Sequence, residues 1–269
     1  MLLTVHFSFF IFLIASFFAN QPKLNLPKSK GLKGGNEIID QIKDLNLELR
    51  EEILLQHFKQ GNIPDFLKQL KPITFGEVIN SKTYKVVIYV SVDYLSFGSD
   101  KDFCLLPMTP TTAERMGKIV DCSLPTRKMV DIIWKAAPIK LKPMPIPPSE
   151  AMTSIPIMHE HHRMVQSQKD SLGYKNGSKH IIAGHKKDVV RSNRQLKNKV
   201  HIYGWHELEG QPIQSLYSGH TDQWVDYSHG IRLVYNTVRV NGKKMQIDEL
   251  LRDPELHVLL SDEGVFRYE

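Results

Sequence analysis

The chain has 269 residues, of which 41% are hydrophobic and 24% charged, and its formal net charge at pH 7 is +6. This balance is typical of a globular protein with one large domain or two small ones, and it excludes disorder over most of the chain. The basic excess is modest and spread along the chain, and no recognised nucleic-acid-binding motif is present, so we expect no nucleic acid partner.

An apolar run without lysine, arginine or acidic residues covers residues 2–19, and polar residues and Pro22 follow it. The pattern is typical of a secretory signal peptide cut after Ala19, which predicts a secreted or periplasmic protein. However, no positive charge precedes the run, and Phe17 stands where a small residue is preferred. The alternative is an uncleaved N-terminal anchor that leaves the rest of the chain outside the cytoplasm. The N-terminus is the only membrane contact that we expect.

Residues 20–36 are rich in lysine, proline and glycine, which predicts a linker that tethers the folded part. Apolar positions at three- and four-residue steps over residues 37–61 then predict one or two amphipathic helices. Residues 64–70 add a short helical turn. Residues 84–96 are rich in β-branched and aromatic side chains, which predicts a strand.

Two further helices are expected after this strand. The first starts at Thr109-Pro110, because threonine is a common capping residue and proline is favoured at the first helical position. The second begins near Ser123. The only two cysteines, Cys104 and Cys122, flank the first of these helices. In an exported protein they meet an oxidising compartment, so we predict a disulfide between them, with two buried thiols as the alternative.

Five prolines between Pro138 and Pro148 exclude a helix and predict a connector over residues 138–150. This connector separates an N-terminal subdomain of helices and a strand, residues 37–137, from a β-rich subdomain, residues 151–269. We therefore predict an α+β fold in which a helical N-terminal part packs on a β-rich C-terminal half.

The second subdomain begins with a helix that contains His159, Glu160, His161 and His162, which we interpret as a solvated stretch because these side chains point to different faces. Several short strand-like runs follow it, and Asn241-Gly242 predicts a type I′ hairpin turn between the last two. A short helix near 247–251 and an apolar segment at 256–260 complete the chain. The strand candidates are residues 181–183, 189–190, 200–203, 231–234 and 238–240.

Nine of the twelve histidines lie between His159 and His229. Histidine titrates near neutral pH and is a common metal ligand, so this part of the sequence is the candidate site. Polar residues interrupt the strand-like runs at three places, and the ends of neighbouring strands can meet in one cleft. The residues that we expect to carry catalysis there are Asp188, His206, Ser228 and His229.

The string Ser228-His229-Gly230-Ile231-Arg232 resembles the Ser-His-Gly-Cys-x-Arg motif of the L,D-transpeptidases, which remodel bacterial peptidoglycan. The resemblance covers about residues 200–235. In that family a histidine at a strand end precedes the motif by somewhat fewer residues, and His206 is its counterpart here. The family's nucleophilic cysteine has no equivalent here, because the chain goes from Gly230 directly to Ile231 and Arg232, so the family's cysteine chemistry is not expected. What the resemblance implies is a peptidoglycan-shaped groove, with Arg232 as a clamp for a carboxylate or another anion.

Two mechanisms remain open without the cysteine. Ser228 can be a nucleophile activated by His206 or His185, with Asp188 or Asp226 orienting the base. Alternatively, a zinc ion can hold the attacking water, with Asp188 or Glu207 as the base. The metal ligands would then be three of His185, His206, His220 and His229. The expected cofactor is therefore zinc or none.

Basic and aromatic residues around the same strings predict contacts with substrate. They are Arg232, Lys186, Lys187, Trp205 and Tyr227. The favoured function is an exported cell-envelope hydrolase or transferase that acts on peptidoglycan or a related polymer. Its expected partner is an anionic envelope polymer or a peptide stem. The surplus of histidines favours catalysis, whereas the missing cysteine favours the alternative, a non-catalytic module that binds an envelope polymer.

Overall fold

The computed structural model describes residues 21–28, 31–174, 177, 179–194 and 196–267. The predicted signal peptide or anchor, residues 1–19, lies outside the described residues. Among the described residues, no helix is both long enough and apolar enough to cross a bilayer.

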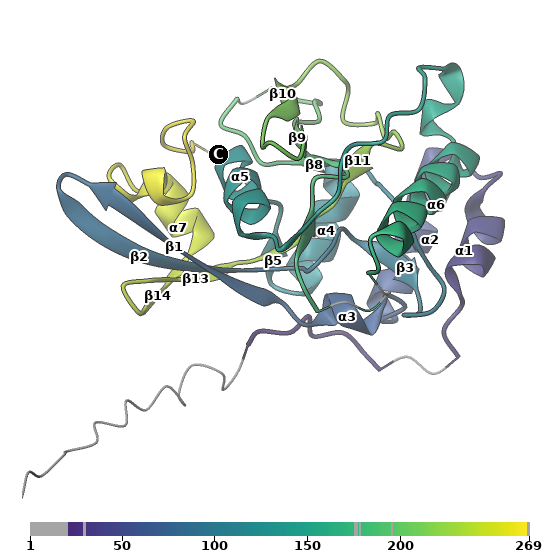
Figure 1. Cartoon of the computed structure of the whole chain (residues 1–269), viewed down its shortest axis with the longest axis horizontal. Helices are drawn as coiled ribbons and strands as arrows, with labels where there is room; N and C mark the ends of the chain where they lie inside the picture. The colour runs from purple at the N-terminus through teal and green to yellow at the C-terminus, as the bar shows by residue number, and fades with distance from the viewer. Residues whose placement is uncertain (1–20, 29–30, 175–176, 178, 195, 268–269) are drawn as a thin grey trace, which may run out of the picture.

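Most helices lie in the first two thirds of the chain, and α1, α2 and α6 gather at one end of the molecule (Figure 1). The predicted cap of α4 is confirmed, because the side chain of Thr109 accepts a hydrogen bond from the amide of Thr112. Thr126 caps α5 in the same way. The helices are α1 (Gly35–Ile42), α2 (Leu47–Lys59), α3 (Asp65–Lys68), α4 (Pro110–Ile119), α5 (Arg127–Ala136), α6 (Ile155–Ser171) and α7 (Ile247–Arg252), with 3-10 turns η1 (Glu150–Thr153) and η2 (Leu256–Leu259).

The largest sheet has six strands and takes them from both halves of the chain. Strand β2 is its centre, pairing antiparallel with β1 on one side and with β12 and β13 on the other. The predicted hairpin turn joins β13 to β14, where Asn241 and Gly242 have φ values of 50° and 83°. The six strands are β1 (Lys71–Ile79), β2 (Lys82–Val90), β5 (Cys122–Ser123), β12 (Val234–Tyr235), β13 (Thr237–Val240) and β14 (Lys243–Gln246).

A second sheet of four strands has the order β10-β9-β8-β11 and contains five of the predicted site residues, Lys187, Asp188, Trp205, His206 and His229. Strands β8 and β11 pair in parallel, which places His229 opposite Lys187 and Gly230 opposite Asp188. Its strands are β8 (Lys187–Val189), β9 (Ile202–His206), β10 (Pro212–Tyr217) and β11 (His229–Gly230), and two small pairs complete the set: β3 (Ser96–Gly98) with β4 (Phe103–Leu105), and β6 (Ile139–Lys140) with β7 (Ile182–Ala183).

The predicted α+β fold is confirmed, with helices concentrated in the N-terminal part and strands in the C-terminal half. The division at residues 138–150, however, does not divide the sheet, because β2 from the first part pairs with β12 and β13 from the second. The proline-rich connector also contributes a strand of its own, β6. Residues 37–137 and 151–269 therefore both contribute strands to the same sheet.

The segment predicted as a linker is partly built into the core. Leu24 is buried, its amide donates to the carbonyl of Lys68, and Lys23 forms a β-bridge with Gln69. Burial of a leucine side chain contributes about 2 kcal/mol, which adds to these backbone contacts. The prediction of a free tether over residues 20–36 is therefore wrong for the residues around Leu24.

The predicted disulfide is also wrong: Cys104 and Cys122 are both free and buried. The sulfur of Cys104 lies 3.7 Å from the carbonyl oxygen of Leu105, and that of Cys122 lies 3.5 Å from the carbonyl oxygen of Val120. Each thiol thus contacts a local carbonyl of its own segment. Burial raises the pKa of Cys104 to about 12 and raises that of Cys122 further, so neither is a thiolate at neutral pH.

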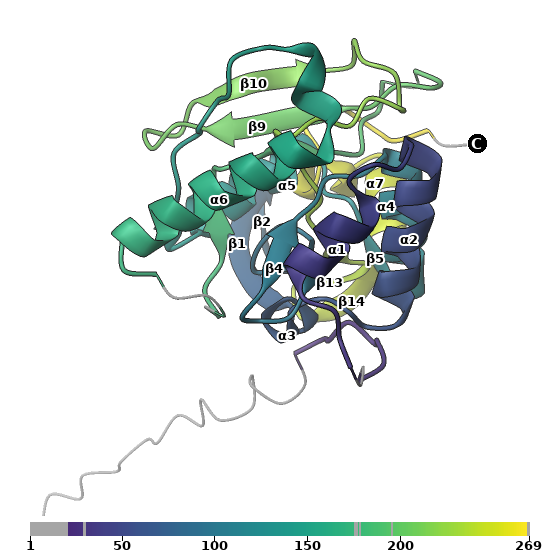
Figure 2. The ribbon, with the colours of Figure 1, turned by 90° about the vertical axis from the view of Figure 1, so that its right-hand side faces the viewer.

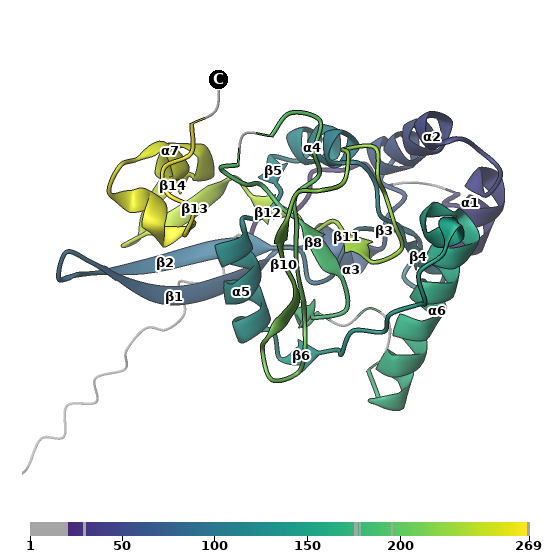
Figure 3. The ribbon, with the colours of Figure 1, turned by 90° about the horizontal axis from the view of Figure 1, so that it is seen from above.

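Helix α5 joins the two main sheets. It contacts β9 of the small sheet as well as β1 and β7 (Figure 3). Its buried residues Met129, Val130 and Ile133 recur at helical spacing, as expected for an amphipathic helix. Asp131 and Trp134 lie at the edge of this apolar face, and both reach His206 at the end of β9.

Candidate active site

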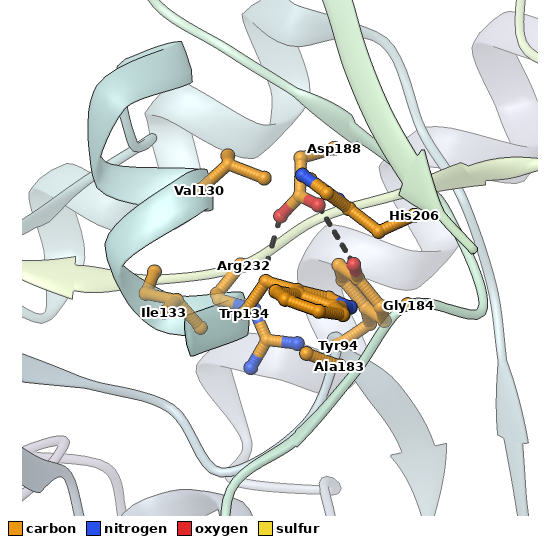
Figure 4. Close-up of a pocket in the computed structure, with 9 residues that line it drawn as sticks. All are labelled: Tyr94, Val130, Ile133, Trp134, Ala183, Gly184, Asp188, His206 and Arg232. Atoms are coloured by element: carbon orange, nitrogen blue, oxygen red, sulfur yellow. Dashed lines mark hydrogen bonds and ion pairs between the residues drawn. The ribbon is translucent and has the colours of Figure 1, made fainter. Parts of the chain in front are cut away.

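A small pocket opens between α5 and the small sheet (Figure 4). Its space is about that of a single water molecule. Three of the predicted residues, Asp188, His206 and Arg232, lie together in its wall. The full lining is Tyr94, Val130, Ile133, Trp134, Ala183, Gly184, Asp188, His206 and Arg232.

Asp188 on β8 is the acidic group of the pocket. Its Oδ2 accepts a hydrogen bond of 2.7 Å from the hydroxyl of Tyr94 (Figure 4). Its buried Oδ1 has no hydrogen-bond partner among the described residues and lies 3.7 Å from Nε of Arg232. Burial raises the pKa of Asp188 to about 6, although Arg232 and the Tyr94 hydrogen bond act in the opposite direction. The carboxyl group can therefore change its protonation state near neutral pH.

Arg232 is held inside the protein rather than presented to solvent. Its Nη1 donates to the carbonyl of Ser91 at 2.9 Å and its Nη2 to the carbonyl of Ile182 at 2.7 Å. The guanidinium also lies 4.3 Å from the centre of the Tyr94 ring. These contacts differ from those of the substrate clamp implied by the motif, because the guanidinium already binds backbone oxygens and neighbours Asp188.

His206 at the end of β9 is oriented by a carboxylate that the sequence reasoning missed. Its Nε2 lies 2.9 Å from Oδ1 of Asp131, the same oxygen that accepts a 2.9 Å hydrogen bond from the hydroxyl of Tyr203. If Nε2 carries the proton, Nδ1 is left as an acceptor, and it has no hydrogen-bond partner among the described residues. Asp131 thus fixes the ring next to Asp188.

Aromatic rings flank the His206 side chain. Trp134 stacks on it with ring centres 5.4 Å apart, and Lys140 lies 4.6 Å from the Trp134 ring centre. The adjacent Trp205 has a left-handed φ of 55°, which is unusual for a bulky residue. Such a conformation costs on the order of 1–3 kcal/mol and is concentrated at functional sites in proteins. Lys187, predicted to contact substrate, packs over the Trp205 ring at 5.0 Å.

The Ser228-His229 string lies in a separate buried cluster. The hydroxyl of Ser228 donates to Oδ1 of Asp226 at 2.5 Å, and Nε2 of His229 lies 3.5 Å from the other oxygen of that carboxylate. Burial alone would raise the pKa of Asp226, but His229 and the Ser228 hydrogen bonds outweigh it and lower the pKa to about 2. The predicted activation of Ser228 by His206 or His185 is wrong, because its hydroxyl is buried and bound to Asp226.

Lys186 and Tyr227, two of the predicted substrate contacts, face inward. Nζ of Lys186 donates to the carbonyl of Tyr227 and lies 3.0 Å from Nδ1 of His161. The hydroxyl of Tyr227 contacts the backbone of Ile146, so it too is engaged. The interpretation of residues 159–162 as a solvated stretch is wrong for His161 and His162, which are both buried, whereas Glu160 is exposed.

The four histidines proposed as zinc ligands do not converge. His185 lies 3.1 Å from Asp93, which also binds Lys169, while His206 and His229 have carboxylates of their own and His220 stacks on Trp224. Within the described residues, no group of three or more His, Cys, Asp or Glu side chains is arranged to hold a metal ion. The geometry therefore does not support the zinc proposal, because each of the four imidazoles contacts a different set of neighbours.

The sequence reasoning found Asp188, His206 and Arg232 but missed Asp131 and Tyr94. These two residues belong to an ordinary amphipathic helix and to the end of a strand-like run, and neither lies in the histidine-rich part of the chain. The one available signal was the spacing of Asp131 and Trp134 on the edge of the helix face.

No family model matches the chain, and searches of curated proteins and of solved structures likewise found no match. The chemistry of the pocket therefore carries the functional inference.

Proposed function

We propose that the protein is a cell-envelope hydrolase or transferase in which Asp188 and His206 perform acid–base catalysis. The observation that carries this proposal is the environment of Asp188, a buried carboxyl with a pKa of about 6 and one oxygen without a hydrogen-bond partner, next to a histidine held by Asp131. Catalytic acids and bases are tuned toward neutral pH by burial in this way.

The proposed roles of Asp188 and His206 follow from their contacts. Asp188 accepts a proton from a water molecule through Oδ1, and the water oxygen attacks the scissile bond of the polymer. His206 takes part as the imidazolium: Nε2–H stays bound to Asp131, and Nδ1–H gives its proton to the leaving group as that bond breaks. One water is added in total, and solvent returns the proton from Asp188 to Nδ1 of His206. A transferase uses a hydroxyl or amine of a second polymer strand in place of the water. Asp131 orients His206, and Tyr94 orients Asp188.

The proposed substrate is peptidoglycan or a related anionic polymer, and the proposed location is the envelope outside the cytoplasm. Support comes from the Ser-His-Gly string, from the apolar run at residues 2–19, and from the groups beside the pocket. Trp134 is partly exposed beside the pocket, and the ammonium of Lys140 lies over its ring, where it can bind an anionic group of the polymer.

A non-catalytic binding module is the second proposal, and one observation favours it. Tyr217 is exposed on β10, and its ring contacts His220, which stacks on Trp224 at 4.9 Å. Such a row of rings away from Asp188 can hold a polymer without cleaving it.

Release of soluble fragments from purified peptidoglycan separates the two proposals. We expect wild-type protein to release fragments, Asp188→Asn and His206→Ala to lose at least a hundredfold in rate, and the exposed control Asp170→Asn to keep it. Sedimentation with the insoluble polymer measures binding in the same samples. Binding without release by the wild type, weakened by Trp224→Ala, would support the binding module and contradict the enzyme.

A further inference from the structure

A second pocket lies on the α6 side of the molecule, where α6, β4 and the start of α1 come together (Figure 2). It is partly open to solvent and shares no residue with the pocket of Asp188. Its lining is Asn36, Lys101, Asp102, Phe103, His159, His162, Arg163 and Gln166.

Half of this lining comes from one face of α6. Positions 159, 162, 163 and 166 follow the spacing i, i+3, i+4 and i+7, which places side chains above one another on a helix. The neighbouring residues His161 and Val165 are fully buried on the side that faces the core. The face of α6 that carries these four polar side chains therefore forms one wall of the pocket.

The lining contains two cationic side chains, Lys101 and Arg163, and one carboxylate, Asp102. Lys101 and Arg163 are exposed, and neither forms a salt bridge within the described part of the chain. The carboxylate of Asp102 is already used, since its Oδ1 accepts hydrogen bonds from the backbone and side-chain nitrogens of Asn36 at 3.2 and 3.1 Å. The lining therefore has a net positive charge, which favours an anionic ligand.

The histidine at the inner end supplies a neutral donor. Nδ1 of His162 accepts a 3.2 Å hydrogen bond from the amide of Leu105, which places the ring proton on Nε2. Burial, together with the nearby ammonium groups of Lys169 and Lys186, lowers the pKa of His162 to about 3. The ring is therefore an uncharged N–H donor at neutral pH.

Gln166 indicates a second chemical group that the ligand carries besides the anion. Both its amide oxygen and its amide nitrogen are buried and have no hydrogen-bond partner in the part of the chain that the structure describes. An unpaired buried polar group lowers stability, so a group that satisfies both atoms is favoured there. An amide is the simple partner that donates one hydrogen bond and accepts another.

We propose that this pocket binds a small ligand in which a carboxylate lies next to an amide, as in an N-acylated amino acid. Lys101 and Arg163 bind the carboxylate, Gln166 turns toward the cavity and pairs with the amide, and Nε2–H of His162 donates to a ligand oxygen. This site does not depend on the acid–base pocket, so either proposal can fail without the other.

Calorimetric titration of the protein with N-acetylalanine tests the site. We expect saturable binding that weakens about tenfold in Arg163→Gln and in Gln166→Leu, because each variant removes hydrogen bonds to the ligand. Lys118→Gln on α4 removes one exposed charge elsewhere and should leave the affinity unchanged. N-acetylalanine amide, which lacks the carboxylate, and acetate, which lacks the amide, should each bind at least tenfold more weakly.

Gln166→Leu also removes an unsatisfied buried amide, so its melting temperature should equal or exceed that of the wild type, which separates lost binding from lost folding. The proposal is overturned if N-acetylalanine gives no saturable heat up to millimolar concentrations. It is also overturned if both variants bind like the wild type, or if the amide analogue binds equally well.

Discussion

The hydroxyl of Tyr94 donates a 2.7 Å hydrogen bond to Oδ2 of Asp188, while the other oxygen of that carboxylate has no hydrogen-bond partner within the described residues. One buried tyrosine thus fixes the carboxylate and reserves Oδ1 for the pocket. Burial raises the pKa of Asp188, and the Tyr94 hydrogen bond limits that rise. This pair is the basis of the acid–base proposal.

Tyr94→Phe should raise the pKa of Asp188 above about 6, because it removes a hydrogen bond that favours the ionised form. The acid limb of a pH–rate profile for polymer cleavage should move to higher pH by about one unit, with the rate at pH 8 nearly unchanged. Tyr203→Phe, which removes a hydroxyl bound to Asp131, is the matched control. An equal shift in both variants would argue against a specific role of Tyr94.

Acid should destabilise the protein well above the pH at which exposed carboxyl groups protonate. Burial lowers the pKa of His162 to about 3 and those of His185 and His229 to about 4. The unfolded chain binds protons on these groups below about pH 6.5 and the folded chain does not, so their contribution to stability is lost as pH falls. Each contributes about 1.4 kcal/mol per pH unit.

Asp188 acts in the opposite direction. Its folded-state pKa is raised, so its contribution is fully present below its ordinary pKa of 3.8 and is lost as pH rises through about 6. Burial lowers the pKa of His161 still further, so these buried histidines outweigh Asp188 and give a net loss of at least about 3 kcal/mol between pH 6 and pH 5. Urea denaturation at pH 7, 6 and 5 measures it, and a free energy of unfolding that is constant or rises toward pH 5 would contradict these burial assignments.

Gly230→Ala should destabilise the protein by at least about 2 kcal/mol, because the added Cβ overpacks a buried site. That Cβ would lie 2.6 Å from Cδ1 of Tyr94 and 2.8 Å from Cβ of Lys186. Gly76→Ala on exposed β1, whose Cβ meets only one atom at 4.0 Å, is the control and should be neutral or slightly stabilising. Equal melting temperatures for the two variants would show that β11 does not pack on Tyr94 as described.

Ser228→Ala should retain cleavage of the polymer if wild-type protein cleaves it, because the Ser228 hydroxyl is buried and bound to Asp226. Loss of this hydrogen bond should lower the free energy of unfolding by about 1–3 kcal/mol. Rate and urea midpoint are measured on the same preparation. A Ser228→Ala protein that folds normally and cleaves nothing would restore serine as the nucleophile.

Thiol labelling checks the state of the two cysteines. Native protein should react with neither thiol, because both are buried with raised pKa values, and the unfolded protein should react with two equivalents without reductant. Zero equivalents after unfolding would mean that Cys104 and Cys122 are bridged.

Much of the fold could be predicted from local patterns. The Thr109-Pro110 start of α4 and the Asn241-Gly242 turn are encoded in two residues each, so a sequence alone is sufficient to place them. Strand β1 escaped prediction because Pro72 and Gly76 interrupt its apolar residues. Its place depends on pairing with β2 along its whole length.

The candidate site was only partly predictable because its carboxylates come from distant segments. His206 depends on Asp131 from α5, and His185 lies next to Asp93 after β2. Tertiary packing alone brings these pairs together. The same packing separates the four histidines that a sequence reading groups as metal ligands, since each ring faces its own neighbours.

The pKa of Asp188 itself tests the central claim most directly. Carbon-13 NMR titration of the aspartate side-chain carboxyl signals measures it, with Asp188→Asn identifying the resonance. A titration midpoint of about 6 in wild-type protein, moving upward in Tyr94→Phe, is the predicted result. A midpoint near the ordinary aspartate value, unchanged by Tyr94→Phe, would contradict the proposal that Asp188 is a buried acid–base group.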